Sequence, residues 1–375
     1  MKLIFKIIRK LKLSKAAFAL LSPLISHKKP LFNTEEALSI LNEIHPDPGN
    51  SCILPEPRRD AADPGLDLDI IIPCYNAEKF LHECIDSVLT QETKYRWRII
   101  AIDDGSTDST GAILDKYAED CRILVKHQEN RGFSGARNAG LDLSSAKYIY
   151  FLDSDDMLCS GMIEKMLDCS EANRADVVEG AFRTVDVNGD IIREYPHNNT
   201  RMRANGDQLG FPCGKVFRRE VFSNICFPLE YWYEDSIIAH IIFPRLALRD
   251  ACVWGCSACS FDYRMNPASI SHTGRSDSRC LDALWIHLRM FDDRQKLGIP
   301  VDQPYYEYLL RMLVLTYHRT ENLSEDAKRA VFTVWSDFFG RNLSGFGTED
   351  KYSRNLEKAV RSGDYGHYSL FCALN

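Results

Sequence analysis

The chain has 375 residues, a formal net charge of −7 and 45% hydrophobic residues. This length is enough for one large domain with an appended one, and the hydrophobic content is enough for a proper core. The acidic balance gives no indication of a nucleic-acid partner. The thirteen cysteines are an odd number without a disulfide-like framework. This pattern favours buried free thiols in a reducing, cytoplasmic compartment.

The amino-terminal segment, residues 1–64, differs from the rest of the chain. Its first 15 residues interleave six Lys or Arg with seven Leu, Ile or Phe, which is typical of a basic amphipathic helix. No apolar run reaches the roughly 18 residues that a membrane span requires. We expect peripheral contact of residues 1–25 with the inner face of the cell membrane; docking on the protein itself and a signal peptide are the alternatives. Residues 46–64, rich in Pro and Asp, indicate a linker.

Strands alternate with helical stretches in the next part of the chain. Apolar strands are predicted at 68–72, 98–102, 122–125 and 148–152, and amphipathic helices between them. This alternation predicts an α/β fold with a doubly wound, mostly parallel sheet and helices on both faces. Such sheets bind ligands beyond the carboxyl ends of their strands. The polar residues expected there are Asn76, Asp103, Asp104, Arg131, Arg137, Asn138 and an acidic run after the fourth strand.

That acidic run contains Asp153, Asp155 and Asp156. Three like charges at the end of a buried strand repel one another, and a hard divalent cation with oxygen ligands compensates them well. A solvated acidic turn is the alternative for an isolated motif of this kind. The other polar residues at the same sheet edge favour a metal site.

Four motifs in this region resemble the nucleotide-sugar-binding half of the inverting family 2 glycosyltransferases, which have the GT-A fold. They are Ile72-Pro-Cys-Tyr-Asn76, Ile102-Asp-Asp-Gly-Ser-Thr-Asp108, Asn130-Arg-Gly-Phe-Ser-Gly-Ala-Arg-Asn138 and Phe151-Leu-Asp-Ser-Asp-Asp156. Their order and spacing are those of the family. A weaker likeness continues through Cys213-Gly-Lys-Val-Phe217, Tyr233-Glu-Asp235 and Tyr263-Arg264, so the resemblance covers about Leu68 to Ser271.

The resemblance implies transfer of a sugar from a nucleotide-diphosphate sugar, with a UDP-sugar favoured, to an acceptor hydroxyl with inversion. The acceptor would be a saccharide or lipid-linked saccharide in bacterial surface polysaccharide or glycolipid synthesis. The implied nucleotide-sugar site consists of Pro73, Tyr75, Asn76, Asp103, Asp104, Arg131, Arg137, Asn138, Asp153 and Lys215.

Several of these residues have a second interpretation. Asp104, or alternatively Asp103, would accept hydrogen bonds from the base or ribose, but both could instead cap the following helix. Arg131, Arg137 and Lys215 are candidates for phosphate neutralisation. Ordinary salt bridges are the alternative for these three cations.

The family pattern also implies a cation and a base. Mg²⁺ or Mn²⁺ would be held by Asp155 with Asp153 and Asp156, and His272 is a possible further contact. Asp235 would be the catalytic base, with Glu234 as the next candidate. Both acids could instead favour a helix amino terminus through its dipole.

The remaining sequence completes the domain prediction. We expect a GT-A domain at 65–272 and a helical region with aromatic core stripes at 273–375. The spacing of Cys252, Cys256 and Cys259 allows an iron–sulfur site, but their apolar, strand-like context favours small core hydrophobes. Two other functions stay open: a nucleotidyltransferase, and a catalytically inactive sugar-nucleotide-binding partner on the same fold.

Overall fold

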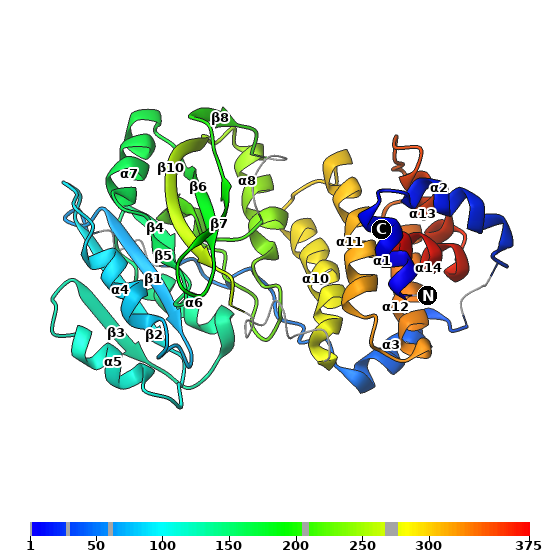
Figure 1. Cartoon of the computed structure of the whole chain (residues 1–375), viewed down its shortest axis with the longest axis horizontal. Helices are drawn as coiled ribbons and strands as arrows, with labels where there is room; N and C mark the ends of the chain where they lie inside the picture. Colours follow the sequence, from blue (N-terminus) through cyan, green and yellow to red (C-terminus); the bar gives the residue numbers. More distant parts are fainter. Residues whose placement is uncertain (1, 28–30, 59–62, 205–209, 267–276) are drawn as a thin grey trace. The chain divides into compact units, whose positions relative to one another are not determined.

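The computed structural model describes residues 2–27, 31–58, 63–204, 210–266 and 277–375 (Figure 1). The chain forms two compact units. Unit 1 consists of residues 1–48, 270–288 and 300–375, and unit 2 of residues 49–269 and 289–299. The amino-terminal residues therefore belong to the same unit as the carboxyl-terminal helices.

Unit 2 is built on a ten-stranded sheet in the order β3-β2-β1-β4-β9-β6-β10-β5, with β7 beside β6 and β8 beside β10. The strands are β1 (Leu68–Cys74), β2 (Trp97–Asp103), β3 (Ile123–His127), β4 (Tyr148–Phe151), β5 (Met157–Leu158), β6 (Val177–Val185), β7 (Ile191–Tyr195), β8 (Thr200–Met202), β9 (Lys215–Arg218) and β10 (Val253–Arg264). The first four strands pair in parallel, which confirms the predicted sheet. Beyond β4 the pairing is mixed, because β9 runs antiparallel to both β4 and β6.

Helices follow the strands of unit 2 in the predicted alternation. They are α4 (Leu81–Leu89), α5 (Thr110–Tyr117), α6 (Gly132–Leu143), α7 (Met162–Asn173) and α8 (Phe243–Leu248). Helix α6 begins at Gly132, so most of the motif 130–138 lies on a helix rather than in the turn before it. The first two turns of α6 therefore carry the polar side chains of this motif.

Helix α6 packs directly against β1. A Cβ atom at Gly140 would lie 2.3 Å from Cγ2 of Ile71, a residue that is fully buried in β1. Only a residue without a side chain allows this close approach. The contact fixes the height of α6 above the sheet, and so the position of the side chains on its first turns.

A buried carboxylate lies near the amino ends of β1 and β2. Asp69 lies in the apolar strand β1 and accepts hydrogen bonds from the guanidinium of Arg98, the hydroxyl of Ser144 and the backbone N–H groups of Ser145 and Ala146. A buried charge is tolerated when its hydrogen-bonding capacity is met in this way. Asp69 thereby joins β1, β2 and the loop that follows α6.

Unit 1 is helical. Its helices are α1 (Lys2–Lys10), α2 (Ser14–Leu21), α3 (Thr34–Ile44), α11 (Gln303–Arg319), α12 (Glu325–Asn342), α13 (Ser353–Arg361) and α14 (Tyr365–Leu374), and α10 (Asp282–Lys296) contributes its first residues. Trp285, Tyr305 and Trp335 are buried, so the predicted aromatic stripes are core. In the described part of the chain, every helix is too short or too polar to cross a membrane.

We expect Gly140→Ala to destabilise the protein, because the added methyl group overlaps Ile71 and must displace α6 or β1. The cost of such overpacking is about 1–3 kcal/mol, measured as a shift in the urea unfolding midpoint. Gly340→Ala is the matched control, because Gly340 lies in α12 and a Cβ there meets no atom within 4 Å. If Gly140→Ala and Gly340→Ala unfold at the same urea concentration, the close contact of Gly140 with Ile71 is contradicted.

Candidate functional site

The carboxyl ends of β1, β2 and β3 meet at two buried carboxylates. Asp103 accepts hydrogen bonds from the backbone N–H of Ser106 at 3.0 Å and from Nδ1 of His127 at 2.8 Å. Burial favours the neutral form of Asp103, but these hydrogen bonds outweigh it and lower its pKa. The same hydrogen bond raises the pKa of His127. Asp103 is therefore held as an anion at the sheet edge.

Asp104 joins the same edge to the start of α6. Its Oδ1 accepts hydrogen bonds from the side chain of Gln128 at 2.7 Å and from the backbone N–H of Arg131 at 3.0 Å. Helix α5 begins seven residues after Asp103, and the N–H of its first residue, Thr110, bonds to Asp108. Asp103 and Asp104 instead bond to Ser106 in the loop after β2 and to Gln128 and Arg131 after β3.

The end of β1 supplies an exposed aromatic ring. Pro73 is buried within β1, whereas the side chain of Tyr75 is about half exposed. Asn76 has a φ of 48°, and its side-chain oxygen accepts a hydrogen bond from the backbone N–H of Thr107 at 2.8 Å. This bond holds the loops after β1 and β2 together and leaves the ring of Tyr75 open to a planar ligand.

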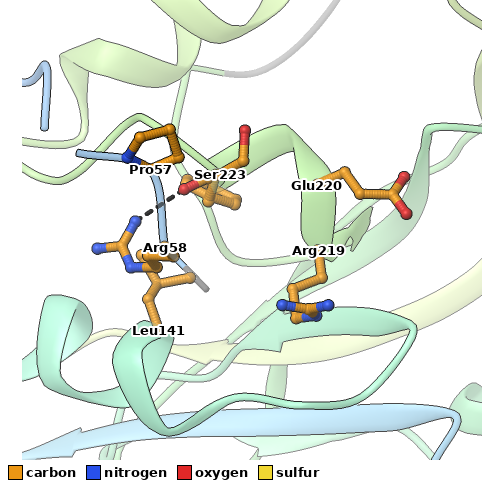
Figure 2. A pocket seen from close by; sticks show the side chains of 7 residues that line it. Pro57, Arg58, Leu141, Arg219, Glu220 and Ser223 are labelled. Carbon is orange, nitrogen blue, oxygen red and sulfur yellow. Dashed lines mark hydrogen bonds between the residues drawn. The ribbon is translucent and has the colours of Figure 1, made fainter. Parts of the chain in front are cut away.

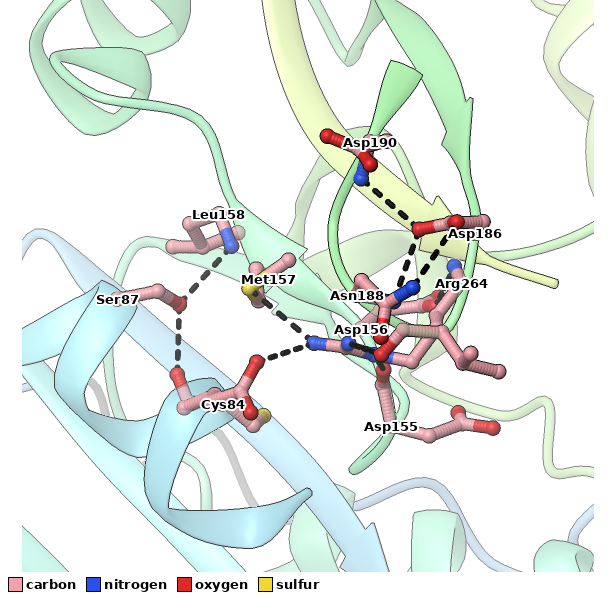
Figure 3. Close-up of polar contacts among 12 residues, drawn as sticks. Cys84, Ser87, Asp155, Asp156, Met157, Leu158, Asp186, Asn188, Asp190 and Arg264 are labelled. Atoms are coloured by element: carbon pink, nitrogen blue, oxygen red, sulfur yellow. Dashed lines mark hydrogen bonds and ion pairs between the residues drawn. The ribbon is translucent and has the colours of Figure 1, made fainter. Parts of the chain in front are cut away.

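The acidic turn after β4 is shaped by Arg264 at the end of β10 (Figure 3). The backbone N–H of Arg264 donates to Asp156 at 2.8 Å, and its guanidinium donates to the backbone oxygen of Asp155 at 3.0 Å and to Glu83 at 2.6 Å. The side chain of Arg264 is buried. In the sequence, Arg264 stands out only as part of the weaker family likeness, because a single arginine at a strand end carries no local signal of such contacts.

The three carboxylates of this turn are not equally compensated. Burial, together with the charge of Asp153, raises the pKa of Asp155. Burial and both neighbouring carboxylates raise the pKa of Asp156 well above its usual value. One buried oxygen of Asp156 accepts no hydrogen bond from any described residue. Crowded, desolvated carboxylates of this kind fit a hard divalent cation, which would favour their charged forms.

Arg137 connects the acidic turn to the predicted base. Its guanidinium donates to Asp153 at 2.9 Å and to Glu234, and it is buried. Its centre lies 5.4 Å from the ring centroid of Phe227. The sequence left phosphate neutralisation and an ordinary salt bridge open for Arg137, and the structure places it between two carboxylates. It therefore compensates protein charges on two separate loops.

Two other predicted donor-binding residues also face the protein interior. The side chain of Lys215 is fully buried, 2.8 Å from the backbone oxygen of Phe211 and 3.6 Å from Glu179, and burial lowers its pKa. The amide of Asn138 exchanges two hydrogen bonds with the backbone of Phe227, at 2.8 and 2.9 Å. Arg131, in contrast, is exposed at the start of α6. Of the three predicted phosphate-binding cations, Arg131 is the one whose side chain reaches the surface.

The predicted base lies on a strained loop. Glu230 and Tyr233 both have φ values near the left-handed region, 67° and 66°, although neither is glycine. Such backbone strain is stored most often at functional sites. Glu234 is buried against Arg137, and Asp235 is partly exposed. The helix expected from residue 236 is a π-helical turn at Ile238–Ile242 followed by α8, and π-helical turns are frequent at functional sites.

The remaining candidates lie elsewhere or outside the described residues. His272 falls in residues 267–276, which the structure does not describe. A second polar cluster joins Cys159, Cys259 and Asp262, but both oxygens of Asp262 accept hydrogen bonds from Arg183 at 2.6 Å. Figure 2 shows a hollow lined by Arg58 and Arg219, among others, which contains none of the predicted site residues. In this hollow, Arg58 fastens the segment before β1 to residues 222–225.

Comparison with known proteins agrees with this geometry. The family model "Glycosyl transferase family 2" matches residues 69–226. Glycosyltransferase GlyG of Streptococcus pneumoniae is 31% identical over 253 residues, which are 62% of this chain and 82% of GlyG. The uncharacterized glycosyltransferase EpsJ of Bacillus subtilis is 43% identical over 116 residues, 31% of this chain and 33% of EpsJ. The chain thus matches only about a third of EpsJ but most of GlyG.

Among solved structures, residues 1–349 of Staphylococcus aureus TarS, in complex with UDP-GlcNAc, superpose with a TM-score of 0.64. The sequence identity is 17%, and the match covers 82% of this chain and 90% of TarS 1–349. At this identity the likeness shows the fold, which is the GT-A fold. With the extended match to GlyG, it follows that the chain belongs to glycosyltransferase family 2.

We expect Arg137→Met to destabilise the protein by about 3–5 kcal/mol, because it leaves the buried carboxylate of Glu234 without a cation. Urea denaturation measures this free energy. Adding Glu234→Gln to Arg137→Met should recover part of the loss, since the uncompensated charge is removed. Arg131→Met is the matched control at an exposed position on the same helix and should stay within about 0.5 kcal/mol of the wild type. An Arg137→Met protein as stable as the control would contradict this assignment.

Proposed function

We propose that the chain transfers a sugar from a nucleotide-diphosphate sugar, most simply a UDP-sugar, to an acceptor hydroxyl with inversion at the anomeric carbon. The observation that carries this proposal is the meeting of three loops at one sheet edge: the aspartates after β2, the acidic turn after β4 and the Glu234–Asp235 loop. Membership of glycosyltransferase family 2 supports it. The complex of TarS with UDP-GlcNAc supports a UDP-sugar as the donor class.

The donor would lie across the carboxyl ends of β1 and β2. Tyr75 offers an exposed ring against which a base can stack, and Asp103 and Asp104 offer carboxylate oxygens toward the base or ribose. Arg131 offers an exposed cation near the diphosphate. A divalent cation held by Asp155 with Asp153 and Asp156 would offset the negative charge of the departing nucleoside diphosphate.

Asp235 is proposed as the base. Single displacement needs a proton acceptor on the face of the sugar opposite the leaving group, within hydrogen-bond reach of the acceptor hydroxyl. Glu234 is buried and hydrogen-bonded to Arg137, so its side chain points into the protein. Asp235 is the partly exposed acid of the pair, and Arg137 fixes the loop that carries it. The proton of the acceptor hydroxyl would pass to Asp235 as the oxygen forms its bond to the anomeric carbon.

We also propose that the acceptor is a saccharide or lipid-linked saccharide in bacterial surface polysaccharide synthesis, with the enzyme at the inner face of the cell membrane. One relative, of Bacillus spizizenii, is named poly(ribitol-phosphate) beta-glucosyltransferase and is 29% identical over 171 residues, 27% of its length. Its name supports a surface-polymer acceptor for this chain.

Incubation of the pure protein with a panel of nucleotide sugars and Mn²⁺ should show slow hydrolysis of one donor. Asp155→Asn should lower this rate by on the order of 100-fold or more, because several kcal/mol of charge stabilisation are lost. Asp190→Asn, an exposed aspartate in the neighbouring β6–β7 turn, is the control and should be unaffected. Full activity of the wild type in excess chelator would contradict the metal assignment, and so would full activity of Asp155→Asn. If added pyrophosphate converts a nucleotide sugar into a nucleoside triphosphate and a sugar 1-phosphate, and no free sugar forms without it, the protein is a nucleotidyltransferase.

Asp235→Asn should leave donor binding within a few-fold of the wild type and lower transfer by roughly 100- to 10,000-fold, the range for loss of a general base. Titration calorimetry with the nucleoside diphosphate and an acceptor assay measure the two effects. If Asp235 only favours the start of the following helical turns, the variant would instead lose about 0.3–1 kcal/mol of stability and keep its turnover. Robust transfer by the folded variant would make Glu234 the next candidate.

A further inference from the structure

The first two helices form a hairpin within unit 1. Helix α1 ends in a Schellman-type turn, in which the N–H of Leu13 bonds to the oxygen of Ile8 and the N–H of Lys12 to that of Arg9, both at 3.0 Å. Lys12 occupies the left-handed position of this turn with a φ of 56°. The turn reverses the chain directly into α2, so α1 and α2 are held as one element.

The inner face of the hairpin is docked. Phe18 is buried, and its ring meets those of Tyr352 at 6.0 Å and Phe371 at 5.7 Å, edge to face. The hydroxyl of Ser14 donates to the backbone oxygen of Leu374. Nη1 of Arg9 lies 3.2 Å from Nε2 of His318. The sequence predicts membrane contact for this segment, with self-docking and a signal peptide as the alternatives, and these contacts show that its inner face packs on unit 1.

The outer face nevertheless carries large apolar side chains. Ile4, Ile7 and Leu11 are 59%, 49% and 60% exposed, and their spacing places them on one stripe of α1. Leu20 and Leu24 follow at helical spacing and are 74% and 77% exposed. Half of the fourteen exposed large hydrophobic side chains among the described residues lie between positions 4 and 31. A clustered patch of this kind on a folded unit marks an interaction site.

The charge of this segment is wholly basic. Residues 1–34 contain eight Lys or Arg and neither Asp nor Glu, in a chain whose net charge is −7. Lys6 and Lys10 are exposed and lie on the helical row beside the stripe of Ile4, Ile7 and Leu11. Apolar side chains bordered by lysines are the pattern of a helix that lies in the plane of an anionic membrane surface.

We propose that the outer face of this hairpin, made of Ile4, Ile7, Leu11, Leu13, Leu20 and Leu24 with Lys6, Lys10 and Lys12, binds the surface of an anionic lipid bilayer. A second copy of the chain fits this face poorly, because a symmetric contact would bring two sets of lysines together. The nine residues of α1 span about 14 Å, less than half of the roughly 30 Å hydrocarbon core, so the hairpin lies on the bilayer and does not cross it.

The inference deepens the location given under the proposed function, but it does not depend on catalysis. Docking through Phe18 would bring unit 1 to the bilayer as a folded body, since the membrane-binding side chains are a different set from the docked ones. Bilayer attachment would then need no unfolding of the hairpin. Electrostatic attraction of this kind is weakened by salt, because it acts between exposed charges.

The test is sedimentation of the full chain with vesicles of phosphatidylcholine, with or without phosphatidylglycerol. The wild type should bind only the mixed vesicles. Leu20→Ser/Leu24→Ser should weaken binding at least tenfold, and Lys6→Gln/Lys10→Gln about 30-fold, from about 1 kcal/mol per basic residue. Ile191→Ser/Ile192→Ser, at two exposed residues of β7, is the matched control and should bind like the wild type. The variants change exposed positions, and unchanged thermal midpoints would confirm that they fold.

Three outcomes would overturn the proposal. The first is that the wild type, as a monomer, does not bind mixed vesicles at low salt. The second is that all variants bind equally well. The third is that the wild type is a dimer and that Leu20→Ser/Leu24→Ser dissociates it. Binding to polyglutamate but not to vesicles would assign the face to an acidic protein partner instead. Donor hydrolysis by Leu20→Ser/Leu24→Ser should match the wild type. If the wild type binds vesicles but hydrolyses no donor, the result would count against the proposed function alone.

Discussion

The candidate site depends on a buried guanidinium. Arg137 lies on the second turn of α6 and bonds to Asp153 after β4 and to Glu234 on the loop before α8. A buried cation is tolerable only when its charge is compensated, and each of these carboxylates needs the same cation in return. Two loops far apart in the sequence are therefore fixed relative to one another by electrostatic necessity. The close contact of Gly140 with Ile71 sets the height of the helix that carries the arginine.

The acidic residues of the site differ in whether they bond to Arg137. Asp153 and Glu234 share the guanidinium, whereas Asp155 and Asp156 have raised pKa values because they are desolvated beside like charges. Arg264 bonds to the same turn mainly through backbone groups and ion-pairs with Glu83; its charge lowers the pKa of Asp155 and Asp156, but burial and the neighbouring carboxylates outweigh it. The turn thus keeps two desolvated carboxylates whose charged forms a further cation would favour.

The amino-terminal hairpin has one face that packs on unit 1 and another that exposes apolar side chains. Its sequence contains more apolar residues than a single docking face uses, and the surplus lies outside among lysines. Burial of Phe18 gives the hairpin a defined place on unit 1. In the proposed membrane contact, the outward leucines and isoleucines would be held on a folded support, which lowers the conformational entropy lost on binding.

The sequence by itself determined the strand–helix order, the parallel sheet of β1 to β4 and the edge at which Asp103, Asp104 and the acidic turn gather. These follow from local hydrophobic periodicity and from the direction of parallel strands, both of which can be read along the chain. Only the tertiary structure decided what each polar side chain touches. Arg137, Lys215 and Asn138 look alike in sequence as polar residues of a ligand site, yet Arg137 bonds to Asp153 and Glu234, Asn138 to the backbone of Phe227, and Lys215 to the backbone oxygen of Phe211 beside Glu179. Such partners are chosen by three-dimensional packing and by the need to compensate buried charge, and neither is encoded in the spacing of a motif.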